Sequence, residues 1–120
     1  MNSDIKIILA DPIGSILASS ASGGCTIQPQ SYLIEGIGGD FVPKNANLKL
    51  VDYSFSISDH ESVECALELF KVEGLFVGGS SGCSLAAARH YIETTHNYKE
   101  NIVVLLPDGG RSYLSTIYKW

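Results

Sequence analysis

The sequence lacks the features that mark several common classes of protein. No apolar run in its 120 residues approaches the ~20 that a transmembrane helix needs. Eight Lys and Arg residues face thirteen Asp and Glu residues, and the net charge of −5 argues against nucleic acid or an anionic membrane as the main partner. The first residues also lack the basic and then apolar layout of a signal peptide. We therefore expect a protein that binds neither nucleic acid nor membrane.

Cysteine is scarce as well. Cys25, Cys65 and Cys83 are odd in number, lie far apart and form no CxxC pair, so we predict reduced thiols and a cytoplasmic location rather than a disulfide or zinc framework. The histidines show no metal-ligand spacing either. Cys83 falls in the first turn of an expected helix, where the dipole lowers a thiol pKa, but the favoured interpretation is a small buried residue.

What the sequence does contain is typical of one α/β domain covering residues 1–120. The residues are 45% hydrophobic and 18% charged, which is ordinary for a globular chain that buries about two-thirds of its unfolded surface. Apolar runs separated by helical periodicity predict parallel βαβ units in a doubly wound sheet. The expected strands are 5–10, 48–55, 75–77 and 102–106, with a further short one at 31–34, and the expected helices are 59–73 and 83–95, with a last turn or two at 113–118.

Two local signals fix the first long helix. Ser58 and Glu61 have the spacing of a capping box, and Gly74 stands where a helix C-terminal glycine is expected. The strand at 102–106 (IVVLL) is the clearest apolar run in the chain and predicts a buried strand.

Glycine-bearing turns follow three of these strands, at 36–39, 78–82 and 107–110. Ligands of parallel α/β sheets bind beyond the carboxyl ends of the strands, so we expect these turns to share one edge and to form the site. Residues 78–82 (GGSSG) also satisfy GxSxG, the elbow of a hydrolase with Ser80 as nucleophile. That alternative is disfavoured because Asp108 could be the acid but no histidine follows it.

Four motifs taken in order resemble the cysteine synthase and cystathionine β-synthase family, a group of fold-type II pyridoxal-phosphate enzymes. Glu35 and the Pro107-Asp108 pair favour the cystathionine β-synthase branch. The matching segments are 10–17 (ADPIGSIL), 35–43 (EGIGGDFVP), 73–82 (EGLFVGGSSG) and 105–108 (LLPD) with Arg111 and Tyr113. The resemblance implies the C-terminal portion of the family's large domain.

The resemblance also implies an activity and a site. The activity is β-replacement on L-serine by homocysteine, which gives cystathionine, and Ser80 would hydrogen-bond the pyridine nitrogen of pyridoxal phosphate. A neutral hydroxyl does not hold the ring protonated as a carboxylate would, and this favours elimination over transamination. The remaining cofactor-binding residues implied are Gly36, Gly38, Gly78, Gly79, Pro107 and Asp108.

The resemblance places the Schiff-base lysine and the phosphate-binding loop upstream of the matched motifs. No catalytic residue is therefore assigned in this chain, and we expect it to be inactive alone. Its partner would be the N-terminal half of a synthase or a homologous subunit, and the amino-acid substrate would bind only to the complete enzyme. A non-catalytic relic or interaction module is the alternative. In either case a parallel sheet cut from a larger one leaves an open edge, which predicts dimerisation, aggregation or dependence on a partner.

Overall fold

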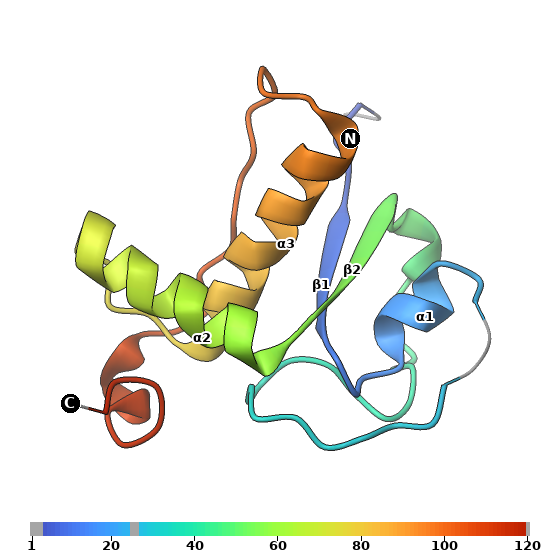
Figure 1. The fold of residues 1–120 in the computed structure, drawn as a ribbon. Helices are drawn as coiled ribbons and strands as arrows, with labels where there is room; N and C mark the ends of the chain where they lie inside the picture. Colours follow the sequence, from blue (N-terminus) through green and yellow to red (C-terminus); the bar gives the residue numbers. More distant parts are fainter. Residues whose placement is uncertain (1–3, 25–26, 120) are drawn as a thin grey trace.

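Two parallel strands form the centre of the structure, a computed structural model that describes residues 4–24 and 27–119 (Figure 1). β1 pairs with β2 over five residues, from Ile8 opposite Tyr53 to Pro12 opposite Ile57. The remaining elements are one short and two longer helices and three shorter helical turns. In chain order the elements are β1 (Ile8–Pro12), α1 (Leu17–Ala21), η1 (Leu48–Leu50), β2 (Tyr53–Ile57), α2 (Asp59–Glu68), η2 (Leu69–Glu73), α3 (Gly79–Thr95) and η3 (Gly110–Tyr113).

The register of the strands separates their side chains onto two faces, as the twofold period of a strand requires. Ala10 and Phe55 share one face and pack on the core against α3. Ser54 lies on the other face, where its Oγ donates a hydrogen bond of 3.2 Å to the carbonyl of Ala18 in α1. Helices therefore cover both faces, which is the layering of a parallel α/β sheet.

Small residues bring α2 and α3 together. The buried core cluster consists of Ile57, Cys65, Cys83, Ala86 and Ala87, so four of its five side chains are small. A Cβ added to Gly82 would collide with the carbonyl oxygen of Ser62 in α2. The two helix backbones are therefore in contact at Gly82, and no side chain fits between them.

The capping box predicted for α2 is confirmed. Ser58 Oγ accepts the backbone N–H of Glu61 at 3.2 Å, and the Glu61 carboxylate accepts the backbone N–H of Ser58 at 3.0 Å. The predicted stop is also confirmed, because Gly74 has a left-handed φ of 71° directly after η2. Local sequence therefore determines both ends of this helical segment.

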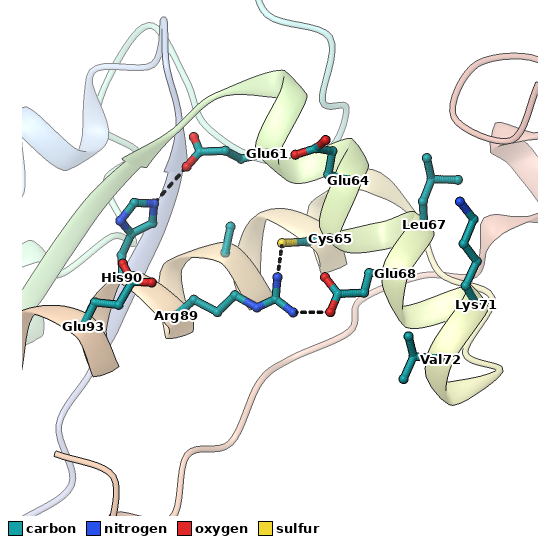
Figure 2. Close-up of a pocket in the computed structure, with 11 residues that line it drawn as sticks. Glu61, Glu64, Cys65, Leu67, Glu68, Lys71, Val72, Arg89, His90 and Glu93 are labelled. Atoms are coloured by element: carbon teal, nitrogen blue, oxygen red, sulfur yellow. Dashed lines mark hydrogen bonds and ion pairs between the residues drawn. The ribbon is translucent and has the colours of Figure 1, made fainter. Parts of the chain in front are cut away.

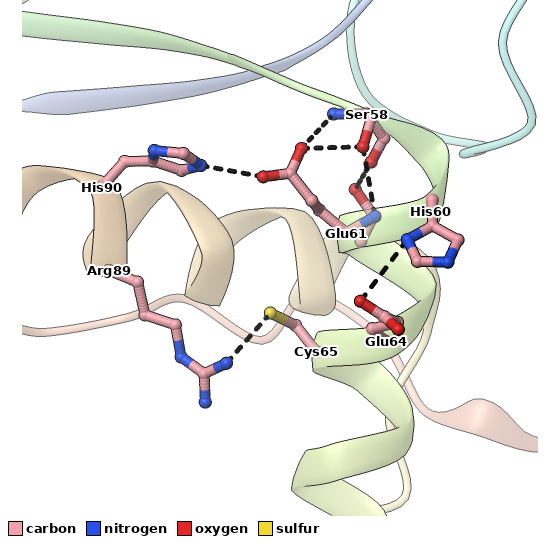
Figure 3. A network of polar contacts seen from close by, with 8 residues as sticks. Ser58, His60, Glu61, Glu64, Cys65, Arg89 and His90 are labelled. Carbon is pink, nitrogen blue, oxygen red and sulfur yellow. Dashed lines mark hydrogen bonds and ion pairs between the residues drawn. The ribbon is translucent and has the colours of Figure 1, made fainter.

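The cap makes the stability of the protein sensitive to acid. Hydrogen bonds from Ser58, followed by one from His90, lower the pKa of Glu61 to about 2 (Figure 3). A carboxyl whose folded pKa lies below its unfolded value stabilises the fold fully above the unfolded pKa, and this contribution is lost as the pH falls through the folded value. We expect the unfolding midpoint in urea to fall between about pH 4.5 and pH 2, and to fall less in Glu61→Gln. Equal pH slopes for the two proteins would contradict this assignment.

The predicted strand at 102–106 is wrong. These residues are extended but pair with no described strand, and Val103 and Leu105 are 86% and 75% exposed. Exposure alternates along the segment, as it does in a strand, but a strand also needs a neighbour that supplies hydrogen bonds. The apolar run is thus suited to a sheet, and the described residues contain no strand beside it.

Other boundaries also differ from the predicted ones. The strand expected at 75–77 is reduced to one antiparallel bridge between Val77 and Gly109. Residues 31–34 form no strand, and the strand expected at 48–55 begins only at Tyr53, after η1. The last helical turns begin earlier than predicted, at Gly110.

Within residues 4–24 and 27–119, no helix has the length and apolar character needed to cross a membrane.

The C-terminal segment is anchored by a buried tyrosine. The Tyr118 hydroxyl donates a hydrogen bond of 2.7 Å to the carbonyl of Val77, and its ring packs against Phe76 at 4.6 Å between centroids. This holds the segment after Leu106 against the turn that begins α3.

Candidate functional site

Two of the three predicted turns are joined directly by backbone hydrogen bonds. The N–H of Gly78 donates to the carbonyl of Asp108 at 3.2 Å, and the N–H of Gly110 donates to the carbonyl of Phe76 at 2.9 Å. These bonds flank the bridge between Val77 and Gly109. Residues 78–82 and 107–110 therefore lie side by side at the N-terminus of α3.

Ser80 lies where these turns meet. It is the second residue of α3 and is 5% exposed. Its Oγ donates to Asp108 Oδ1 over 3.5 Å, at the long limit of a hydrogen bond. A buried hydroxyl with one weak partner remains able to donate a better hydrogen bond to a ligand.

The two glycines before Ser80 allow other groups to approach the backbone closely. A Cβ on Gly78 would collide with the Asp108 carboxylate and would lie 2.7 Å from the Tyr113 ring. A Cβ on Gly79 would lie 2.8 Å from the Ile34 side chain. Glycine at both positions thus lets the Asp108 carboxylate and Ile34 pack against the first turn of α3.

Tyr113 holds the carboxylate of Asp108 in place. Its hydroxyl donates a hydrogen bond of 2.7 Å to Asp108 Oδ2. This bond, with burial and the charges of Asp108 and Glu35, raises the pKa of Tyr113 to about 12. Tyr113 belongs to one of the family motifs, but its contact with Asp108 has no sequence signal, because a spacing of five residues across a turn does not indicate a contact.

The third glycine turn lies beside this site but does not share a hydrogen bond with Ser80. Gly36 and Gly38 have φ values of 79° and 76°, which favour glycine. A Cβ on Gly38 would lie 2.6 Å from the Tyr32 hydroxyl, whereas one on Gly36 would point into open space. Ile34, two residues before this turn, packs against Gly79 and so connects the turn to the site. Pro107 is exposed next to Asp108.

Other candidates from the sequence lie elsewhere. Burial raises the pKa of the Cys83 thiol to about 11, which fits the interpretation as a small core residue. His90 pairs with Glu61 at 2.9 Å and His60 with Glu64 at 3.4 Å, so neither ion pair includes Ser80 as a triad would require (Figure 3). In the part of the chain that the structure describes, no three His, Cys, Asp or Glu side chains are grouped as metal ligands. Cys25 lies outside the described residues.

A hollow of about 650 Å³ lies between α2 and α3 and is lined largely by charged side chains (Figure 2). Arg89 bridges the helices there, because it donates to Glu68 at 2.8 Å and to Cys65 Sγ at 3.6 Å. The side chains of Arg89 and Glu68 are both close to half exposed. These contacts cross-link the two helices, and we assign them a structural role.

Comparison with known proteins identifies the family to which this chain belongs. The family model described as pyridoxal-phosphate dependent enzyme matches residues 1–108, and the chain belongs to this family. It is 39% identical over 113 residues to cysteine synthase A of Escherichia coli and 41% identical over 116 residues to cystathionine beta-synthase of Saccharomyces cerevisiae. Its structure matches the cysteine synthase of Entamoeba histolytica with a TM-score of 0.83 and 30% identity. The predicted resemblance to this family is confirmed.

The chain corresponds to part of these proteins. The matches cover 94% to 99% of the chain but only 35% of the E. coli protein, 23% of the yeast protein and 34% of the Entamoeba structure. The protein is therefore a partial fold-type II domain, as predicted.

The family implies pyridoxal phosphate as cofactor, and the residues of the site fit its ring. A pyridine nitrogen needs a hydrogen-bond donor, and Ser80 Oγ is a buried donor with one weak contact. The turn thus presents a donor that the described residues leave poorly satisfied, as a ligand-binding position would.

Proposed function

We propose that this chain forms the pyridine-nitrogen side of the cofactor site in a β-replacement synthase of the cystathionine β-synthase type. The observation that carries the proposal is the Ser80 hydroxyl, buried at the N-terminus of α3 beside Asp108. Residues 1–120 would form one partial domain, and Ser80, Gly36, Gly38, Gly78, Gly79, Pro107 and Asp108 would line the cofactor.

The chain's own residues would bind and orient the ring. When bound, pyridoxal phosphate supplies the electron-withdrawing system that lets the β-substituent of an amino acid leave. Ser80 would donate its hydroxyl proton to the ring nitrogen as a neutral partner. Tyr113 would hold the Asp108 carboxylate in place beside Ser80. Because the Ser80 hydroxyl has one proton, donation to the ring nitrogen would replace its long contact with Asp108.

The catalytic lysine would come from a partner. All six lysines of the chain are exposed, and Lys6 is engaged by Glu100 at 3.5 Å. A lysine that forms a Schiff base is commonly activated in a desolvated pocket, and none of the six lysines of this chain is buried. We therefore propose that the chain is inactive alone and acts with a polypeptide that carries the lysine and the phosphate-binding loop.

Reconstitution tests this function. The probe is the part of the yeast cystathionine beta-synthase that precedes the residues matched by this chain, mixed with the chain, pyridoxal phosphate, L-serine and homocysteine. We expect cystathionine from the mixture and none from either component. A complex that binds the cofactor but forms no cystathionine would favour a non-catalytic interaction module instead.

A further inference from the structure

The glycine turn at 36–39 belongs to a part of the chain that no secondary structure holds in place. The described residues between α1 and η1 form no helix or strand, and they run past the carboxyl ends of β1 and β2 (Figure 1). Ligands of parallel α/β sheets bind at this end of the strands, so the position of the turn affects the site. We call residues 33–39 the turn segment. Side chains from other parts of the fold hold both of its ends.

Ser15 holds the C-terminal end of the turn segment. Its Oγ accepts the backbone N–H of Gly39 at 2.9 Å and donates to the carbonyl of Gly39 at 3.2 Å. The N–H of Ile16 donates to the same carbonyl at 3.0 Å. Ser15 is 1% exposed, so water does not compete for these bonds. The family motif at 10–17 (ADPIGSIL) thus holds the turn segment from one side.

Asp59 holds the N-terminal end of the turn segment. The backbone N–H of Leu33 donates to both carboxylate oxygens of Asp59, at 3.0 Å each. The side chain of Leu33 is 78% exposed and therefore does not anchor the segment by burial. Asp59 is the first residue of α2 and directly follows Ser58, the N-cap of that helix. The helix and its cap therefore fix the backbone that carries this carboxylate.

The contact between Asp59 and Leu33 is relayed to the first turn of α3. Ile34 follows Leu33 and is 3% exposed, and its Cδ1 would lie 2.8 Å from a Cβ added to Gly79. Gly79 directly precedes Ser80, the residue whose hydroxyl we assign to the ring nitrogen. If the backbone of Leu33 were displaced, Ile34 would move away from Gly79, and the glycine turn that follows would move with it.

We propose that Asp59 is a positioning residue of the cofactor site. It acts through Leu33 and Ile34, and it fixes the glycine turn relative to the N-terminus of α3, where Ser80 lies. Both parts of the chain would line the cofactor, so a turn segment released at one end would leave the width of the site undefined. A hydrogen bond to a charged acceptor suits this role because it is stronger than one between neutral groups. This inference rests on the proposed function, since it concerns the same site.

Asp59 also lies in the first turn of α2, where a negative charge stabilises a helix. Two substitutions separate this structural role from positioning. Asp59→Ala removes both the charge and the acceptor, whereas Asp59→Asn removes the charge but keeps an oxygen that can accept the N–H of Leu33. If Asp59 acts by positioning, asparagine behaves like aspartate. If it acts only through its charge on the helix, asparagine behaves like alanine.

Asp52 provides a matched control. Its Oδ2 accepts the backbone N–H of Ile7 at 2.8 Å, and these two residues directly precede β2 and β1. The bond therefore lies at the opposite end of the sheet from the turn segment. Asp52→Ala breaks the same kind of bond, between an aspartate and a backbone N–H, without reaching the site.

Amide hydrogen exchange of the chain tests the contact itself. We expect Asp59→Ala to speed exchange at Leu33 about tenfold, the factor that corresponds to the loss of one hydrogen bond. Exchange at Leu33 should be unchanged in Asp59→Asn and in Asp52→Ala, and Asp52→Ala should instead speed exchange at Ile7. Equal exchange at Leu33 in Asp59→Ala and in the unmodified chain would overturn the proposal.

Cofactor retention by the chain reconstituted with the preceding part of the yeast cystathionine beta-synthase tests the consequence for the site. We expect Asp59→Ala to weaken retention of pyridoxal phosphate after dialysis at least about threefold, and Asp59→Asn to restore it. Full retention by Asp59→Ala, beside an unmodified pair that retains the cofactor, overturns the positioning role alone. Equal loss in Asp59→Ala and Asp59→Asn assigns the effect to the helix charge and also overturns it. An unmodified pair that retains no cofactor overturns the proposed function as well.

Discussion

Gly82→Ala is expected to lower the free energy of unfolding by at least about 3 kcal/mol, the upper range for overpacking a core. The added Cβ would overlap the carbonyl oxygen of Ser62 and lie 2.9 Å from the backbone nitrogen of Ala66. Both obstacles are backbone atoms of α2, which cannot rotate away as a side chain could. Since a domain of this size is stable by about 5–15 kcal/mol, this loss is large enough to be seen as a shifted urea midpoint or as a failure to fold.

Gly109→Ala is the matched control. Gly109 has a φ of −90°, and the nearest atom to an added Cβ is 3.8 Å away, so alanine fits there without strain. We expect a change within about 0.5 kcal/mol, as at an ordinary surface position. Similar losses in the two variants would show that close contact between α2 and α3 is not what holds glycine at position 82.

Ser80→Ala is expected to weaken retention of pyridoxal phosphate by the reconstituted pair about tenfold. The variant removes one hydrogen bond to the ring, and a bond in a buried site contributes about 1.4 kcal/mol, which corresponds to that factor. Ser80→Thr keeps the hydroxyl and should restore part of the loss. The measurement is the fraction of cofactor that remains on the complex after dialysis, read from its visible absorbance.

Ser81→Ala is the control for this variant. Ser81 neighbours Ser80 and is fully buried, but its Oγ has no hydrogen-bond partner among the described residues. Its loss should leave cofactor retention unchanged. If Ser81→Ala released the cofactor and Ser80→Ala did not, the assignment of the ring-nitrogen ligand would be wrong.

The parts of the fold that could be predicted are those determined by neighbouring residues. The capping box of Ser58 and Glu61 and the left-handed Gly74 depend on contacts within a few positions, and both are present. A parallel sheet is also predicted and is present, but the helical patterns on which that prediction depends lie after β2, and α1 between β1 and β2 is not among the predicted helices.

The parts that could not be predicted depend on distant residues or on residues beyond the described chain. Residues 102–106 have the composition of a buried strand, but pairing needs a neighbour, so they are extended and exposed. Residues 75–77 likewise form only one bridge, between Val77 and Gly109, because a strand also needs neighbouring residues with which to pair.

The candidate site shows the same division. Ser80 and Asp108 were assigned through the family motifs, and the structure places their side chains 3.5 Å apart. The role of Tyr113 depends on a turn that brings it back to Asp108, and no spacing rule indicates this contact. Gly36 lies in the predicted glycine turn and has a left-handed φ of 79°, but a Cβ added there would face open space, so its place in a cofactor site remains a proposal.

The site at which pyridoxal phosphate becomes covalently attached tests most directly whether this chain forms only the ring-nitrogen side of the cofactor site. The chain alone and the chain with its yeast complement would each be incubated with the cofactor, reduced with borohydride and analysed by mass spectrometry of peptides. We expect stoichiometric labelling of one lysine of the complement in the pair, and no stoichiometric label on any of the six lysines of this chain. Stoichiometric labelling of a single lysine in the chain alone would contradict the claim that it forms only the ring-nitrogen side of the site.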